Sequence, residues 1–297
     1  MDKDVFSSFH PLVNFVWFTT VLLFSMFFMH PVFLTISLTC SFVYSVVLNG
    51  KKAVRFNLLY LLPLLFFVAL INPAFNHAGE TILFYLKNGN PVTLESIIYG
   101  IAAAAMFIAV ILWFSCYNAV MTSDKFIYLF GRVIPALSLI LSMVLRFVPR
   151  YKAQIKIIAN TQKCIGRDVA SGNFFRRAHN GIRILSIMTT WALENAIETA
   201  DSMKSRGYGL PGRTSFSIFR FDKRDKTALL FMVILIAIVL YGAAIGQNNI
   251  RFFPSIKMPV MNGSSILIYC AYFFLSLIPI IIDAAEEIKW KHIRSRI

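Results

Sequence analysis

The sequence predicts an all-α polytopic membrane protein, a bundle of apolar helices that carries a separate, polar pair of helices. Of its 297 residues, 58% are hydrophobic and only 14% are charged, well below the roughly one quarter of charged residues in an average soluble domain. Twenty-nine phenylalanines in this background indicate lipid contact rather than a soluble core. Most of the charge lies in one region, residues 146–226, which we interpret as a non-membrane part.

Six apolar segments predict the membrane-spanning helices, because a spanning helix needs about 20 mainly apolar residues. None of the six has Lys, Arg, Asp or Glu in its interior. Pro31 follows His30 between the first two segments and separates them, since proline lacks the backbone donor that a helix interior needs. The segments are residues 12–29, 32–48, 56–72, 96–120, 227–246 and 264–282.

A seventh apolar stretch, residues 127–145, contains Arg132 and Pro135, and topology decides its placement. The loop 49–55 is basic and is therefore expected on the cytoplasmic side. If 127–145 crossed the membrane, the strongly basic region 150–226 would be exported, against the same rule. We therefore expect 127–145 to be interfacial or re-entrant, and both chain termini to be cytoplasmic.

This topology divides the chain into three parts. Residues 1–126 hold the first four transmembrane helices, with an outer loop at 73–95. Residues 127–226 hold the interfacial helix and the cytoplasmic helices, and residues 227–297 hold the last two transmembrane helices and a cytoplasmic tail. In the outer loop, Asn88-Gly89 lies between two apolar runs and predicts a β-hairpin, and Thr93 is placed to cap the next helix.

The cytoplasmic region contains two helical patterns, at about 147–166 and about 182–206. Each has apolar residues at helical spacing, and the second also carries an acidic stripe at i, i+4 and i+7 on its opposite side. The apolar positions are Tyr151, Ile155, Ile158 and Ala159 in the first helix and Ile184, Ile187, Met188, Trp191, Ala192, Ala196 and Met203 in the second; the acidic stripe is Glu194, Glu198 and Asp201.

Each of these helices ends in a short triplet with glycine last. The first triplet is Cys164-Ile165-Gly166 and the second is Ser205-Arg206-Gly207. Glycine just past a helix end adopts the left-handed conformation at low cost, and a cation in the last turn suits the helix dipole. From spacing alone, a simple helix stop explains both triplets.

With these residues the chain resembles the transmembrane T component of energy-coupling factor (ECF) transporters, a class of ABC importers for vitamins and metal ions. The resemblance covers nearly the whole chain: the helix bundle, Arg146-Phe147-Val148-Pro149 before the cytoplasmic helices, the two glycine-ended triplets, and the Arg213-Thr214 that follows the second. It implies a cytoplasmic coupling module of two long crossed helices. It also implies a multi-pass protein of a bacterial or archaeal cell membrane, with two ATPase subunits and a small membrane substrate-binding (S) component as partners.

The resemblance implies specific roles for the triplets, since each coupling helix of that family ends in an Ala-Arg-Gly-like triplet whose arginine inserts into a groove of one ATPase. Ser205, Arg206 and Gly207 match this pattern. Cys164, Ile165 and Gly166 hold the first position with isoleucine in place of arginine, which cannot offer a planar guanidinium fork. Lys163 or Arg167 would then substitute, or the partner ATPase would have an altered groove.

Other classes of function fit the sequence less well. A conventional ABC permease subunit would carry one short coupling helix with an EAA-type loop, which is not found, and another polytopic transporter driven by ions would hold ionisable groups within its spans. An enzyme is not expected, because the five histidines are scattered without HExxH and the four cysteines form no CxxC pair. The sequence therefore predicts no catalytic, metal or cofactor site. We interpret the net charge of +15 as the result of basic residues that set the topology of the chain in a lipid bilayer, and not as a sign of nucleic-acid binding.

Overall fold

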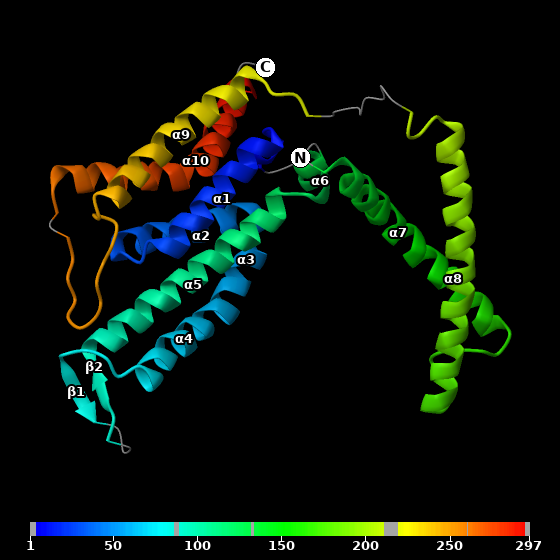
Figure 1. Cartoon of the computed structure of the whole chain (residues 1–297), viewed down its shortest axis with the longest axis horizontal. Coiled ribbons are helices and arrows are strands. Elements are labelled where there is room, and N and C mark those ends of the chain that lie inside the picture. Colours follow the sequence, from blue (N-terminus) through cyan, green and yellow to red (C-terminus); the bar gives the residue numbers. More distant parts are fainter. Residues whose placement is uncertain (1–3, 86–88, 132–133, 211–218, 260, 295–297) are drawn as a thin grey trace. The chain divides into compact units, whose positions relative to one another are not determined.

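The structure, a computed structural model of the whole chain, describes residues 4–85, 89–131, 134–210, 219–259 and 261–294. The chain forms two compact units (Figure 1). The membrane unit comprises Met1–Phe126 with Phe219–Ile297, and the helix-pair unit comprises Ile127–Ile218. The membrane unit thus joins both ends of the chain, whereas the three-part division above stays an interpretation of topology.

The membrane unit is a bundle of apolar helices. Among the described residues, five helices are long and apolar enough to cross a membrane, and α1, with 17 residues, is a shorter apolar helix. This confirms an all-α, multi-pass membrane protein. The helices are α1 (Pro11–Phe27), α2 (Pro31–Asn49), α3 (Lys51–Phe56), which continues through a π-helical turn (Asn57–Leu61) into α4 (Leu62–Phe75), α5 (Leu94–Val120), α9 (Lys223–Ala244) and α10 (Gly263–Arg294), preceded by a 3-10 turn at Phe6–Ser8.

The break between α1 and α2 lies where the sequence predicted it. Pro31 is the first residue of α2, where its missing N–H costs nothing. The His30 ring accepts a hydrogen bond from the Val32 N–H at 3.3 Å. The histidine therefore caps the helix that the proline begins.

The predicted hairpin is also present. Strands β1 (Ile82–Tyr85) and β2 (Pro91–Thr93) pair antiparallel, and Thr93 accepts a hydrogen bond from the Ser96 N–H at 3.3 Å as the cap of α5. Gly89 has φ 80°, as its turn requires, while residues 86–88 lie outside the described residues. His77 contacts the Pro91 carbonyl and the Asn90 amide, both at 3.1 Å, and no metal-binding group of three His, Cys, Asp or Glu occurs among the described residues.

Buried tryptophans join four helices of the bundle. Trp17 and Trp113 meet edge to face, with ring centroids 5.4 Å apart. The Trp17 N–H donates to the Leu275 carbonyl at 2.8 Å, and the Trp113 N–H donates to the Ser37 hydroxyl at 2.9 Å. Both polar groups are satisfied away from water, which fixes α1, α2, α5 and α10 together.

The helix-pair unit corrects two predicted boundaries. The stretch 127–145 is not one element: its beginning lies in α6 (Ser123–Gly131), and its end lies in α7 (Pro135–Cys164). The first of the two predicted cytoplasmic helices therefore starts at Pro135 and not near residue 147, and proline is well tolerated in a first helical turn. The second, α8 (Phe174–Ser205), starts eight residues before 182, where the exposed Phe174 and Phe175 give no amphipathic signal. Helix α7 is not among the candidate membrane spans of the described residues; its interfacial position stays a prediction.

Candidate functional site

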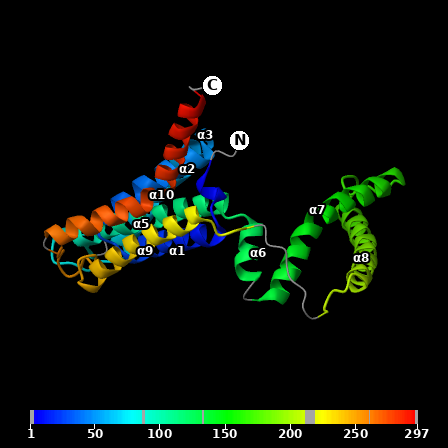
Figure 2. The same cartoon turned by 90° about the horizontal axis from the view of Figure 1, so that it is seen from above.

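Helices α7 and α8 cross and pack through a small apolar cluster (Figures 1 and 2). Ile158 of α7 and Ile184 and Met188 of α8 are buried. Tyr151 meets Trp191 edge to face at 5.5 Å. These residues were predicted as one apolar face per helix, and the structure joins the two faces, except that Ile155 of the predicted α7 face is 40% exposed and lies outside the cluster.

The α8 face differs in detail from the prediction. Ile187 and Ala196 are exposed, whereas Asn195 is 9% exposed and donates to the Trp191 carbonyl at 3.1 Å. Asn195 lies one helical repeat beyond Met188, so it faces α7 despite its polar side chain. The pattern of apolar letters could not reveal this position.

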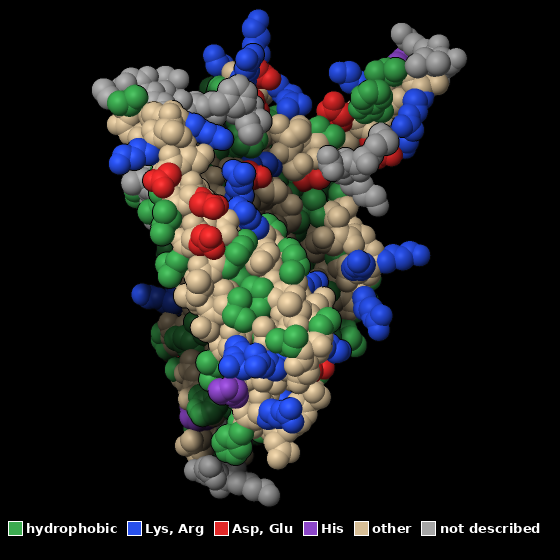
Figure 3. Space-filling view, turned by 90° about the vertical axis from the view of Figure 1, so that its right-hand side faces the viewer, with side chains coloured by type: hydrophobic (Ala, Val, Ile, Leu, Met, Phe, Trp, Pro, Cys, Tyr) green, Lys and Arg blue, Asp and Glu red, His purple; other side chains and the backbone are tan. Residues whose placement is uncertain are grey.

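The acidic stripe of α8 is exposed, but the prediction that it lies opposite the apolar face is wrong for Glu198, which lines a hollow beside α7. Glu194, Glu198 and Asp201 are all solvent-accessible, and Figure 3, which faces this unit, shows acidic side chains close together on its surface. Among the described residues none of the three forms an ion pair.

The first triplet forms a complete glycine-ended helix stop. Gly166 has φ 77°. Its N–H donates to the Lys163 carbonyl at 3.0 Å, and the Arg167 N–H donates to the Gln162 carbonyl at 2.9 Å. These two bonds define a Schellman motif, which needs a left-handed residue at the glycine position. Ile165 precedes the glycine and is 58% exposed.

The second triplet ends α8 with the same pair of bonds. Gly207 has φ 71°. Its N–H donates to the Lys204 carbonyl at 3.0 Å, and the Tyr208 N–H donates to the Met203 carbonyl at 3.0 Å. Arg206 stands where Ile165 stands in the first triplet, and it is likewise exposed. Sequence spacing predicted both stops, and both are confirmed.

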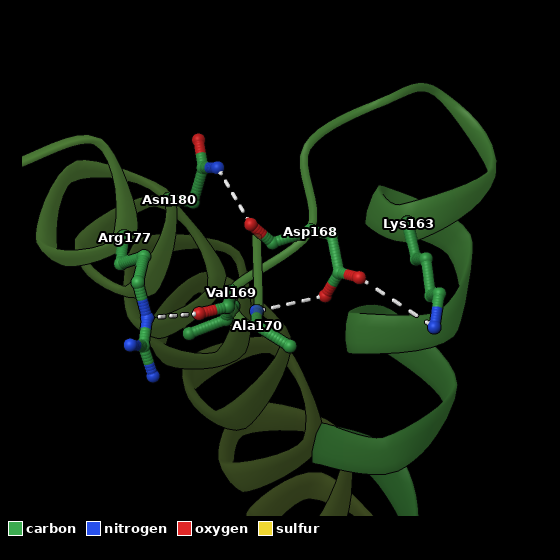
Figure 4. A network of polar contacts seen from close by, with 6 residues as sticks. All are labelled: Lys163, Asp168, Val169, Ala170, Arg177 and Asn180. Atoms are coloured by element: carbon green, nitrogen blue, oxygen red, sulfur yellow. Dashed lines mark hydrogen bonds and ion pairs between the residues drawn. The ribbon is translucent and has the colours of Figure 1, made fainter. Parts of the chain in front are cut away.

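A polar network holds the loop after the first triplet (Figure 4). Lys163 pairs with Asp168 at 3.5 Å, and the Asp168 carboxylate accepts the Ala170 N–H at 2.9 Å. That N–H and, second, the Lys163 ammonium lower the pKa of Asp168. Lys163 is therefore paired within its own loop, whereas Arg167 is exposed and forms no ion pair among the described residues.

The same loop is fastened to the beginning of α8. The Asn180 amide donates to the Asp168 carbonyl at 3.0 Å, and the Arg177 guanidinium donates to the Val169 carbonyl at 2.9 Å (Figure 4). The end of α7 is therefore anchored near the start of α8. Arg177 and Asn180 lie in the first turns of α8, before the helix start predicted at about residue 182.

The second triplet borders a hollow between the two helices. This cavity of about 680 Å³ is lined by residues of α7 from Met143 to Arg150 and of α8 from Asn195 to Arg206. It brings Arg206 together with Arg146 and Arg150, opposed by Glu198. The Arg150 guanidinium lies 5.5 Å from the centre of the Trp191 ring, a cation–π contact. Three guanidinium groups and one carboxylate suit an acidic partner surface.

The chain is similar to known proteins over part of its length. No family model matches the chain. It is 37% identical over 106 residues to the energy-coupling factor transporter transmembrane protein EcfT of Staphylococcus aureus, covering 35% of this chain and 39% of that protein. It is 33% identical over 105 residues to EcfT of Lactobacillus helveticus, covering 35% of this chain and 38% of the relative.

A longer alignment joins the chain to a Mycoplasma pneumoniae protein described as an uncharacterized MG181 homolog. The identity is 29% over 179 residues, covering 55% of this chain and 41% of the relative. The chain thus spans about two fifths of the length of the curated relatives it matches. The resemblance to ECF transmembrane components, drawn above from the triplets, is confirmed over about a third of the chain.

Proposed function

We propose that this chain, a relative of ECF transmembrane components, is the membrane coupling subunit of an ECF-type ABC importer. It transmits ATP-driven movement of two ATPase subunits to a separate substrate-binding membrane protein that takes up a vitamin or metal ion. The main observation in support of this proposal is the pair of equivalent helix endings, Ile165-Gly166 after α7 and Arg206-Gly207 after α8. The chain itself performs no catalysis in this role.

The spacing of the two endings supports two ATPase partners. The loop after the first ending is hydrogen-bonded to Asn180 near the start of α8. The second ending contains Arg206, which lies 26 residues after Asn180 in the sequence. At a rise of 1.5 Å per residue, the endings are on the order of 40 Å apart. Each ending therefore meets a different subunit rather than two sites on one small surface.

Arg206 is the principal ATPase contact in this proposal. Its guanidinium can bind a carboxylate with two parallel hydrogen bonds, and Arg146 and Arg150 line the same hollow. Ser205 and Gly207 hold it at the helix end. At the first ending, Cys164, Ile165 and Gly166 make the corresponding contact, in which Ile165 packs against an apolar surface and Arg167 supplies the charge.

The crossing of α7 and α8 transmits the motion. Ile158, Ile184 and Met188 form an apolar contact at the crossing, and such a contact can roll without breaking directional bonds. When ATP draws the two ATPases together, the helix ends move and the angle between the helices changes. The long arms on either side of the crossing pass this change on.

Exposed apolar side chains of α8 provide a face for the substrate-binding component. Ile182, Leu185, Leu193 and Ile197 are each at least 60% exposed and recur at helical spacing on the side away from the α7 contact. Exposed apolar side chains gathered on one face of a helix support a protein or membrane interaction site. The chain's positive-inside pattern places this module on the cytoplasmic side of the cell membrane, with both termini cytoplasmic.

Co-purification with ATP-hydrolysing subunits tests the proposal. The affinity-tagged full chain, extracted from its native membrane, should retain two ATP-binding subunits that hydrolyse ATP, together with one small membrane protein. Arg206→Glu should remove the ATPases, whereas the control Arg183→Glu, on an exposed site of α8, should retain them. Retention of the ATPases by Arg206→Glu, or their absence from the unmodified chain, would contradict the proposal.

A further inference from the structure

An apolar groove opens on the membrane unit beside the start of α4. Its volume is about 330 Å³, and its walls come from α2, residues 57–65 and α5. Leu61, Ile108 and Leu112 form a buried cluster beneath it. Leu58 and Leu62, at its edge, are 56% and 47% exposed. A second apolar hollow of about 580 Å³ shares Leu65 with this groove, so the apolar surface continues along α4.

Asn57 places an unpaired polar group on the groove. It lines the groove and is only 6% exposed, and its amide nitrogen has no hydrogen-bond partner among the described residues. Thr39, which also lines the groove, donates its hydroxyl to the Thr35 carbonyl of its own helix at 2.8 Å. A buried donor without a partner is costly, so Asn57 marks a place where a ligand acceptor belongs.

The backbone at Asn57 is also irregular. Residues Asn57–Leu61 form a π-helical turn inside an otherwise α-helical segment. Such single turns inside α-helices are frequent at functional sites. Here the turn begins at the residue with the unpaired amide.

Basic residues lie just before the groove on the same helix. Lys51, Lys52 and Arg55 are exposed, and none forms an ion pair among the described residues. Lys51, Arg55 and Leu58 stand at i, i+4 and i+7 and therefore share one helix face. The sequence has no acidic residue between Asp4 and Glu80, so nothing in this stretch neutralises them.

We propose that this groove binds one anionic phospholipid of the surrounding bilayer. An acyl chain lies along Leu58, Leu62 and Leu65, the Asn57 amide donates to an ester carbonyl of the glycerol, and Lys51 and Arg55 bind the phosphate. Asn57 lies about 3 Å beyond Arg55 and about 9 Å beyond Lys51 along the helix axis, an axial offset that matches the distance from a lipid phosphate to its ester groups. Because Arg55 and Asn57 are two residues apart, they point to different sides of the helix, and the long basic side chains reach the phosphate from the Leu58 edge of the groove.

A phospholipid explains the apolar groove, the unpaired Asn57 amide and the exposed basic residues together. An apolar helix of a membrane partner satisfies its own backbone groups and offers Asn57 no acceptor and Lys51 no anion. Anionic lipids attract exposed basic residues at the membrane surface, and the groove supplies the acyl-chain contact that a surface charge alone lacks. This inference depends on the membrane location of the bundle and not on the proposed coupling role.

Photo-crosslinking in vesicles tests the site. The full-length chain is reconstituted into phosphatidylcholine vesicles that contain a trace of one of two lipids with the same photoreactive acyl chain, one with a phosphatidylglycerol headgroup and one with phosphatidylcholine. Mass spectrometry then locates the adducts. The phosphatidylglycerol probe should label peptides containing Leu58 or Leu112 several-fold more than the phosphatidylcholine probe does.

Two variants and one control sharpen the result. The double variant Lys51→Gln/Arg55→Gln should lower labelling by phosphatidylglycerol to the phosphatidylcholine level, and Asn57→Leu, which keeps the side-chain size, should lower it too. The control Lys289→Gln/Arg294→Gln removes the same charge from the end of α10 and should leave labelling unchanged. Equal labelling by both headgroups, or labelling that persists in both groove variants, would overturn the proposal.

Discussion

Ile165 and Arg206 occupy the same backbone position in two helix endings of the same geometry. Their dihedral angles are φ −97°, ψ 21° and φ −84°, ψ 11°, and each is followed by a left-handed glycine. Both side chains are exposed. The asymmetry between the two endings therefore lies in the side chain that is presented, and not in the backbone that presents it.

Substituting arginine for the exposed isoleucine tests this equivalence. Ile165→Arg should leave the α7 ending intact, because Arg206 adopts the same backbone geometry in the second ending. If the first ATPase groove is an ordinary arginine groove, co-purification of the ATPases should survive higher salt than it does with the unmodified chain, since a guanidinium–carboxylate contact is added.

The opposite result of that substitution is equally informative. Loss of assembly in Ile165→Arg, with the chain still folded in detergent, would show that the first partner groove is built for an apolar side chain. A control at Arg183, changed to lysine, keeps the charge and should leave assembly unchanged at every salt concentration.

The glycines of the two endings should resist substitution. Gly207→Ala places a side chain at φ 71°, where the left-handed conformation costs about 1–2 kcal/mol, and should destabilise the end of α8 by about that amount. Hydrogen exchange of the Tyr208 N–H should speed up by roughly tenfold as the Schellman bond weakens.

A helical glycine provides the matched control for that substitution. Gly181 lies within α8 and an added Cβ there meets no atom within 4 Å. Gly181→Ala should therefore stabilise α8 by about 0.5–1 kcal/mol. If Gly207→Ala stabilised α8 as Gly181→Ala is expected to do, the left-handed conformation assigned to Gly207 would be wrong.

The native Cys164 can report the topology directly. It is an exposed free cysteine at the end of α7, so a membrane-impermeant maleimide should label it in inverted vesicles and not in intact cells. Cys164→Ser should abolish that signal. Glu80→Cys in the outer loop should show the reverse pattern, and labelling of Cys164 from outside intact cells would overturn the interfacial assignment of residues 127–145.

A buried carboxyl pair predicts a pH dependence at the N-terminal segment. Burial, and next the charge of Asp283, raise the pKa of Asp4 from its ordinary 3.8 to about 7. Tyr44 donates its hydroxyl to Asp4 at 3.4 Å, and the Asp283 carboxylate accepts the Val5 N–H at 2.8 Å. Lys125, in the neighbouring α6, is the nearby cation, although it donates to backbone carbonyls.

The sign of the effect follows from the raised pKa. The folded state favours the protonated Asp4, so this stabilisation is complete below about pH 4 and is lost as pH rises through about 7. Thermal unfolding of the unmodified chain should become easier across that interval. Asp4→Asn mimics the neutral acid and should flatten the dependence; an unchanged slope in Asp4→Asn would exclude the pair as its cause.

Local chemistry made several elements predictable from the sequence. Pro31 begins α2, Gly89 lies before the second hairpin strand at φ 80°, and Gly166 and Gly207 end helices, because each of these residue types has a backbone preference that few alternatives share. The two endings of the candidate site were predictable for this reason. Their equivalence as matching hydrogen-bond patterns required the structure.

The remaining features depend on packing between distant segments. Helix α7 runs without a break from its apolar first turns, which start at Pro135, into its polar part. The change in hydropathy near residue 146 made this one helix look like two elements in the sequence. Asn195 is buried because its position around α8 faces α7, although its side chain is polar. The hollow shared by Arg146 and Arg206 depends on how α7 and α8 cross, which no spacing within either helix specifies.

Crosslinking from the second helix ending tests the central claim most directly. A photoreactive phenylalanine analogue in place of the exposed Tyr208, beside the second triplet and with Arg206 retained, in chains co-expressed with the candidate ATPases, should crosslink one ATPase subunit, and the same analogue at position 165 should crosslink the second nucleotide-binding subunit of the pair. The matched probe at position 183 should crosslink neither. Crosslinks from position 208 to lipid alone, or to no ATPase, would contradict the assignment of these endings as the sites that couple the membrane bundle to ATP hydrolysis.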